Sequence, residues 1–184
     1  MGEPKLLLLW RGAPLVEHVI RAYQTAGIDK IVAVVHPEDE TLAAVCRALG
    51  AEAVRPAHPP AEMKDSVRLA LEFARGRWNP AADAVWLLAP ADLPGLSPEV
   101  VFQLLAAADE QPDRILTPVH QGRTGHPALF PWSLAQEVAT LSAGQGVNAL
   151  VARHAPVPIE CGPAAVCRDV DTPEDYQRLH EENG

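Results

Sequence analysis

The sequence is poor in the residues that stabilise extracellular proteins. Its 184 residues include only three cysteines, and no two of them form a Cys-x-x-Cys pair; they are Cys46, Cys161 and Cys167. An odd number without that spacing argues against a disulfide framework and a structural zinc site, and favours buried free thiols in a reducing cytosol. No apolar run approaches the length of a membrane span or of a signal peptide's apolar segment. The sequence therefore predicts a cytoplasmic protein.

Positive charge is also scarce. The chain has 15 lysines and arginines against 24 acidic residues, a formal net charge of −9, and no basic cluster. A general nucleic-acid binder needs a basic face that displaces counterions from phosphates, so we reject that class of protein. The net negative charge does not exclude a small anionic ligand, provided that a metal ion or backbone N–H groups mediate the contact.

Several familiar catalytic motifs are missing. The sequence has no G-x-G-x-x-G, no G-x-x-x-x-G-K-[ST] and no G-x-S-x-G. Dinucleotide oxidoreductases, P-loop ATPases and α/β-hydrolases depend on these motifs, so those three classes lose most of their support.

What the sequence does contain is an alternation of apolar runs and amphipathic segments. Two apolar runs, 31–35 and 84–89, are typical of strands buried on both faces. Helices are predicted at 14–27, 38–49, 62–75, 97–109, 133–141, 147–154 and from 172 onward. Further strands are predicted at 52–54, 115–119, 127–130, 157–160 and 165–170. This order predicts a single α/β domain over residues 1–184, in three layers on a mainly parallel sheet.

Asp92 stands in the turn after the predicted strand 84–89. Ligands of open α/β sheets bind outside the carboxyl ends of the strands, and a carboxylate there can hold Mg²⁺ against phosphate oxygens. A turn aspartate that bonds its own backbone is the alternative. Asp169 and Asp171 follow another predicted strand, where they would either complete a metal site or cap the next helix and offset its dipole.

Two further segments could approach a ligand. Gly122–Pro127 has two glycines and a His-Pro step, and its His126 could bind a phosphate or act as a base, with a structural role as the alternative. Residues 62–66 open a helix, whose free N–H groups favour an anion or a base edge. An ordinary helix start with an acidic first turn is the alternative there.

Together these segments resemble the MobA-like nucleotidyltransferases, and most of all their molybdenum cofactor cytidylyltransferase branch. The resemblance covers essentially the whole chain, and it depends on the order and spacing of motifs that are weak one by one. The matching segments are Met1–Lys5, which resembles the end of a glycine-rich loop, Gly12–His18, Met63 with Ser66, Ala91–Pro94, Gly125–Pro127 and Asp169–Asp175.

The resemblance implies a three-layer α/β/α Rossmann-like fold and a Mg²⁺-dependent transfer reaction. A phosphate, such as that of molybdopterin, attacks the α-phosphorus of an NTP, with CTP favoured, and pyrophosphate leaves. On this resemblance Asp92 and Asp171 hold the metal, and Lys5 offsets phosphate charge; Lys5 and Asp92 are the catalytic pair. The residues assigned to the nucleotide are Lys5, Met63, Ser66 and Asp92, and those assigned to the acceptor are Gly125, His126 and Pro127.

The chain departs from the family pattern at its start. The first strand and most of the glycine-rich loop are missing, which should expose the apolar edges of neighbouring strands and favour a homo-oligomer. Glu62 stands where the family has glycine, and a Gly-Asp pair is absent near Gly144. Either translation begins upstream and the 184-residue chain is an impaired catalyst, or the chain is a non-catalytic relative that binds a partner or a pterin. Among enzymes, a transferase acting on a sugar phosphate or another phosphorylated small molecule is the alternative.

Overall fold

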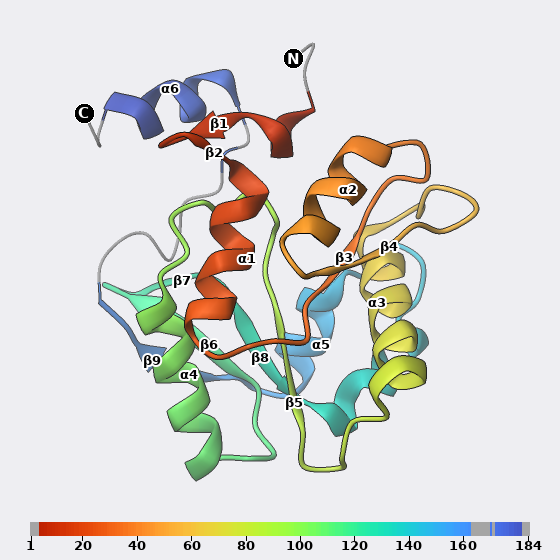
Figure 1. Ribbon diagram of the computed structural model, residues 1–184. Helices are drawn as coiled ribbons and strands as arrows, with labels where there is room; N and C mark the ends of the chain where they lie inside the picture. Colours follow the sequence, from red (N-terminus) through yellow and green to blue (C-terminus); the bar gives the residue numbers. More distant parts are fainter. Residues whose placement is uncertain (1–3, 163–169, 171, 182–184) are drawn as a thin grey trace.

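A computed structural model describes residues 4–162, 170 and 172–181 (Figure 1). The helices are α1 (Leu15–Thr25), α2 (Glu40–Ala48), α3 (Met63–Trp78), α4 (Pro98–Glu110), α5 (Val147–Arg153), α6 (Pro173–Glu181) and the 3₁₀ segments η1 (Lys5–Leu7) and η2 (Trp132–Thr140). The strands are β1 (Leu9–Trp10), β2 (Ala13–Pro14), β3 (Val32–Val34), β4 (Glu52–Val54), β5 (Val85–Leu88), β6 (Leu116–His120), β7 (Arg123–Thr124), β8 (Ala128–Pro131) and β9 (Val157–Glu160). The predicted strand at 165–170 lies outside the described residues except for Val170.

The strands form two main sheets. β3 and β4 pair in parallel, while the larger sheet has the order β5-β8-β6-β7, with β9 beside β6. Among the described strands of the larger sheet, only β6 and β9 pair in parallel. The predicted α/β class is confirmed, and the larger sheet is mixed rather than mainly parallel because β8 runs antiparallel between β5 and β6.

Helices cover both faces of the larger sheet (Figure 1). Successive side chains of a strand point to opposite faces. Trp86 of β5 accordingly packs with Val67 and Leu71 of α3, and stacks on Phe130 with ring centroids 4.1 Å apart. Leu87, the next residue, packs on the opposite face against α1 and α4. This alternation produces the predicted three layers.

Two predicted helix starts have the expected caps. The Ser97 hydroxyl accepts a hydrogen bond from the Glu99 N–H at 3.2 Å, with Pro98 at the first helical position. At α6, the Asp175 N–H donates to the Thr172 hydroxyl at 3.1 Å, and the Asp175 carboxylate accepts from the Thr172 N–H at 2.8 Å. Both helices therefore begin where hydroxyl residues satisfy otherwise unpaired N–H groups.

The prediction that 31–35 and 84–89 are buried on both faces is wrong in part. All three residues of β3 are half-buried, and in β5 only Trp86 is buried. The physical reason is that, in the part of the chain that the structure describes, each of these strands pairs on one side: β4 pairs with β3, and β8 pairs with β5. Among the described residues, no strand lies between β3 and β5.

The N-terminal segment is attached to the last helix. β1 and β2 form a short antiparallel hairpin that the sequence did not predict. The Tyr176 hydroxyl donates to the Leu9 carbonyl at 2.5 Å, and the Trp10 ring N–H donates to the Leu179 carbonyl at 3.3 Å. Within the described ranges, no helix is both long and apolar enough to cross a bilayer.

Candidate active site

The predicted site segments gather where β3, β5 and β6 end, at the upper side of Figure 1. We call this side the carboxyl edge. Asp92 follows β5 in the turn that leads to α4. The loop Gly125–Pro127 directly precedes β8, whose first residue, Ala128, lies opposite Leu88 at the end of β5. The two segments are therefore at the same edge of the sheet.

Lys5 and Asp92 form the centre of this edge. The Lys5 Nζ donates to Asp92 Oδ2 at 2.5 Å, although the two residues are 87 positions apart. Both side chains are largely covered, with 28% and 17% of their surface exposed. The Val170 N–H also donates to the Asp92 carbonyl at 3.1 Å, so the C-terminal segment is held at the same turn. A lysine at a sheet edge can bind a phosphate oxygen, and a carboxylate beside it can bind a divalent cation that in turn binds phosphates.

The donor set fits a metal site that the substrate completes. Within residues 4–162, 170 and 172–181, no group of three or more His, Cys, Asp or Glu side chains is placed to hold a metal. Mg²⁺ is usually bound by one or two carboxylates together with substrate phosphates and water, so the single carboxylate of Asp92 is compatible with it. Asp171, the other predicted ligand, lies outside the described residues, as does Asp169.

The predicted acceptor loop is largely closed to solvent. Gly125 and Pro127 are buried and His126 is half-buried, with a cis peptide bond between His126 and Pro127. The Gly125 N–H donates to the Pro118 carbonyl at 2.9 Å. The loop is therefore fixed against β6 as well as β8, which gives a ligand a firm wall at the carboxyl edge.

The start of α3 carries the predicted nucleotide residues. The Met63 side chain is 61% exposed, and Ser66 is half-buried one turn further on. The Asp65 carboxylate accepts from the Glu62 N–H at 3.1 Å. The remaining N–H groups of this first turn are positioned to favour negative charge or a base edge.

A buried lysine beside this turn was missed by the sequence reasoning. Lys64 is 9% exposed, donates to the Ser142 carbonyl, and pairs with the Glu62 carboxylate at 3.1 Å. The Gly144 N–H donates to Glu62 at 3.2 Å. The Lys64 hydrogen bond, and then the Gly144 N–H, hold the pKa of Glu62 below its usual range. The sequence did contain a signal for this pairing. Lys64 lies near two acidic residues in the first turn of a helix, where the helix dipole disfavours a positive charge unless it has an anionic partner.

An α/β sheet with helices on both faces and a lysine–aspartate pair at its carboxyl edge is compatible with a nucleotidyltransferase type of domain. The family model described as "MobA-like NTP transferase domain" matches residues 1–157. The chain belongs to that family, as its motifs predicted. The closer resemblance to the molybdenum cofactor branch stays a prediction.

Relatives by sequence and by structure agree with this membership. The chain is 37% identical over 108 residues to the bifunctional enzyme IspD/IspF of Novosphingobium aromaticivorans, a match that covers 59% of this chain and 27% of that enzyme. It is 34% identical over 117 residues to the bifunctional protein GlmU of Sorangium cellulosum, covering 61% and 24%. The chain thus spans about a quarter of the length of the curated relatives it matches.

Among solved structures, Rv0371c of Mycobacterium tuberculosis H37Rv is similar to the chain, with a TM-score of 0.80 and 26% identity over 98% of this chain and 91% of that one. The complex of Rv0371c with manganese is similar at a TM-score of 0.78, with 26% identity over 97% and 91% of the two chains.

Proposed function

We propose that this chain transfers a nucleoside monophosphate, with CMP favoured, from an NTP to a phosphorylated small molecule. An oxygen of the acceptor phosphate forms a bond to the α-phosphorus, the bond from that phosphorus to the bridging oxygen breaks, and pyrophosphate leaves. The observation that carries the proposal is the Lys5–Asp92 pair at the carboxyl edge. Family membership over residues 1–157 supports the reaction class.

In this proposal the protein works by positioning and by electrostatics. Asp92 holds a divalent cation, with Mg²⁺ favoured, which supplies positive charge at the phosphates when bound. Lys5, released from Asp92, neutralises a phosphate oxygen. The manganese complex of the mycobacterial relative supports a divalent ion. Asp171 is the proposed second ligand, because it follows Val170, which is hydrogen-bonded to Asp92.

The proposed acceptor site is the loop Gly125–Pro127, and the base of the nucleotide would lie at Met63 and Ser66. Molybdopterin is the acceptor that the sequence motifs favour. A sugar phosphate or another phosphorylated small molecule is the alternative acceptor. We place the reaction in the cytoplasm, because Cys46 and Cys161 are buried free thiols, which a reducing compartment preserves.

The test is pyrophosphate release. The purified chain is incubated with each NTP, with molybdopterin or a panel of sugar phosphates, and with Mg²⁺, Mn²⁺ or a chelator. We expect release with one NTP–acceptor pair, dependent on the metal, and loss of release in Asp92→Asn. Asp113→Asn, a change of the same type in an exposed loop, is the matched control and should keep full activity. No pyrophosphate from any pair, in this chain or in an N-terminally extended one, would overturn the proposal.

A second candidate function is binding without transfer. The observation that favours it is the position of the Glu62 carboxylate beside the start of α3. This carboxylate already binds the Lys64 ammonium and the Gly144 N–H, two groups that could otherwise bind a phosphate. Calorimetry with CTP and with molybdopterin separates the two functions. Binding of the pterin alone, with no CTP binding even in Glu62→Gly, would favour the non-catalytic relative.

A further inference from the structure

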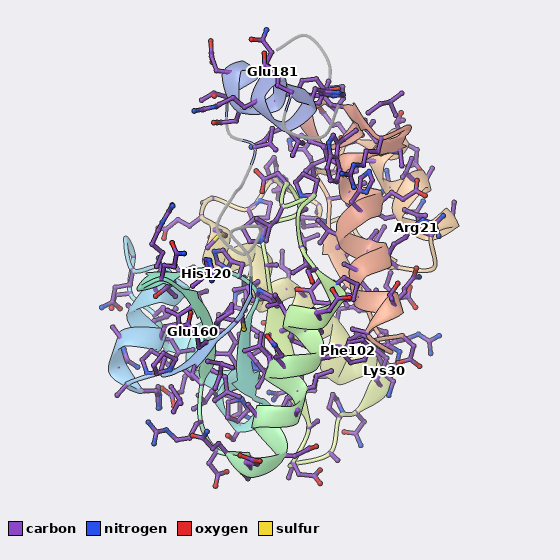
Figure 2. All side chains as sticks on the ribbon, turned by 90° about the vertical axis from the view of Figure 1, so that its left-hand side faces the viewer. Arg21, Lys30, Phe102, His120, Glu160 and Glu181 are labelled. Atoms are coloured by element: carbon purple, nitrogen blue, oxygen red, sulfur yellow. The ribbon has the colours of Figure 1, made fainter. Side chains whose placement is uncertain are left out.

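The 9–14 hairpin and the last helix form one packed unit on the side of the carboxyl edge. Figure 2 shows α6 beside this hairpin, and Figure 1 shows the same arrangement from another direction. The Tyr176 hydroxyl donates to the Leu9 carbonyl. The Trp10 ring N–H donates to the Leu179 carbonyl. We call the 9–14 hairpin and α6 together the terminal clasp.

The hairpin and α1 restrict the position of the Trp10 ring. Arg11 and Gly12 have φ values of 49° and 81°, as a two-residue type I′ hairpin turn requires. The Arg11 guanidinium lies 4.6 Å from the centre of the Trp10 ring. The His18 ring of α1 meets the indole nearly edge-on, with the centroids 4.6 Å apart, and its Nε2 donates to the Trp10 carbonyl at 2.7 Å. The indole is therefore contacted both from its own hairpin turn and from α1.

Trp10 belongs to a small apolar cluster that joins the two ends of the described chain. Its buried members are Trp10, Leu15 and Val170, none of which is more than 7% exposed. Tyr176 and Leu179 of α6 pack against these three side chains. Because Trp10 and Leu15 come early in the sequence and Val170 comes shortly before α6, the place of the Val170 side chain depends on the N-terminal hairpin.

Val170 is also the residue that connects the terminal clasp to the candidate active site. Its side chain is in the apolar cluster, while its N–H donates to the Asp92 carbonyl at 3.1 Å. Lys5 contacts the same aspartate through the carboxylate. The backbone of Asp92 is thus held by Val170, and its side chain by Lys5.

The hydrogen bond from Val170 restricts the backbone on which the Asp92 carboxylate is carried. A residue rotates only about φ and ψ, so a bond to the Asp92 carbonyl limits ψ at that residue. The next residue, Leu93, is buried against Val19 and Tyr23 of α1, which fixes the chain after the turn. In the proposed reaction Lys5 leaves Asp92 for a phosphate oxygen, and the bond from Val170 does not depend on that lysine.

Metal ligands need supporting contacts that fix their orientation, and loss of such a contact typically costs about 10- to 100-fold in metal affinity. We propose that the terminal clasp orients the divalent-cation site, with Trp10 and Val170 as positioning residues. Trp10 holds the Val170 side chain, and the Val170 N–H orients the Asp92 backbone, so that the carboxylate is directed toward the cation. This role rests on the proposed function, in which Asp92 binds the metal of a metal–nucleotide complex.

The first experiment measures how tightly CTP binds in the presence of Mn²⁺. Isothermal titration calorimetry gives the dissociation constant of CTP for the whole chain, with saturating Mn²⁺ and with EDTA. Asp92→Asn should remove the gain in affinity that Mn²⁺ provides. Val170→Ala shrinks a side chain of the apolar cluster and leaves Asp92 in place, so it should weaken CTP binding in Mn²⁺ by about 10-fold. Its CTP binding in EDTA should equal that of the parent chain.

Val138→Ala is the matched control, because Val138 is 2% exposed and belongs to another apolar cluster. Both valine variants should lower the urea midpoint to a similar extent, and only Val170→Ala should weaken binding in Mn²⁺. Equal weakening in both would contradict the positioning role. If Asp92→Asn loses the gain from Mn²⁺ and Val170→Ala keeps it, the clasp does not orient the site and the proposed function stands. If the parent chain shows no gain, or Asp92→Asn keeps it, both proposals are wrong.

The second experiment needs no metal. Trp10→Phe removes the ring N–H that bonds to Leu179 and replaces the indole that packs with Val170 by a smaller ring. Exchange of the Val170 amide hydrogen should become at least about 10-fold faster in this variant, and exchange at Leu116, which pairs with β8 and β9, should not change. Trp78→Phe in α3 is the control and should leave the Val170 amide as in the parent chain. Unchanged exchange at Val170 in Trp10→Phe would show that the clasp does not hold this residue at the active-site turn.

Discussion

At the scale of single residues, the catalytic role proposed for the Lys5–Asp92 pair can be tested separately from the contribution of the pair to stability. The Lys5 side chain is still 28% exposed, so it can be solvated when its partner is removed, and we expect the pair to contribute about 1 kcal/mol to the free energy of unfolding. Losing a group that organises transition-state charge costs about 100- to 1,000-fold in rate. We therefore expect Asp92→Ala to abolish metal-dependent turnover by at least that factor, while urea denaturation shows a small loss. Asp113→Ala is the control, and equal loss of activity in both variants would contradict the assigned role.

Tyr23 and Tyr176 make a matched pair for hydrogen bonding. Tyr23→Phe removes a buried hydroxyl that lacks a partner among the described residues, so the free energy of unfolding should rise by about 1 kcal/mol. Tyr176→Phe removes the hydrogen bond to the Leu9 carbonyl, so that free energy should fall by about 0.5 kcal/mol. Chemical denaturation of both variants at one pH gives the two signs. Destabilisation by Tyr23→Phe would show that its hydroxyl has a partner.

Glu62 should make stability depend on pH. Its pKa in the folded protein lies below the usual 4.5, because Lys64 and the Gly144 N–H favour the charged form. A carboxyl group whose pKa is lower in the folded than in the unfolded protein stabilises the fold at pH values above its unfolded-state pKa. This stabilisation is lost as the pH falls through its folded-state pKa. Glu62→Gln should therefore lower the urea midpoint at pH 7, and the difference from the parent chain should shrink as the pH is lowered below 4.5. Glu72→Gln on the same helix, which breaks only the exposed pair with Arg68, should change little at pH 7.

At the scale of elements, helix α4 depends on its cap. Ser97→Ala leaves the Glu99 N–H without its side-chain acceptor, and the loss of such a cap costs about 1 kcal/mol. Ser133→Ala, in the exposed part of η2, is the matched control and should stay within about 0.5 kcal/mol of the parent chain. Thermal and urea unfolding measure both. Equal effects would mean that packing, and not the cap, sets the start of α4.

The helices were predictable because their signals are local. Ser97 and Thr172 mark helix starts through their own hydroxyl groups, and both predictions are confirmed. The 9–14 hairpin was not predictable, because it is stabilised by α6, far away in the sequence. The 3₁₀ form of η2 also differs from the predicted helix at 133–141.

The site was also predictable in part, because some of its residues belong to motifs that can be recognised from their spacing in the sequence. Motif spacing selected both Lys5 and Asp92, which the structure brings into contact. It did not select Lys64, whose burial depends on the Ser142 carbonyl 78 positions away. The roles proposed for all of these site residues stay predictions: Lys5, Met63, Ser66, Asp92, Gly125, His126, Pro127 and Asp171.

At the scale of the whole molecule, the two sheets should differ in stability. Helices α1 and α3 each contact both sheets, yet no sheet hydrogen bond joins β3 or β4 to β5 in the described parts of the chain. Local openings begin where few interactions hold a unit in place. Native-state hydrogen exchange should therefore find openings of β3 and β4 that cost at least about 1 kcal/mol less than openings of β6 and β8. Equal opening energies would show that the helices alone couple the halves.

The cavity of about 550 Å³ between the two sheets contains its own optical reporter. The chain has four tryptophans, and three of them, Trp78, Trp86 and Trp132, are among the residues that line this cavity. Water beside an indole shifts its fluorescence to longer wavelength, and an apolar neighbour reverses that shift. Filling the cavity should therefore move the intrinsic emission of the protein toward the blue without any added dye, so a simple spectrum can follow occupancy during purification.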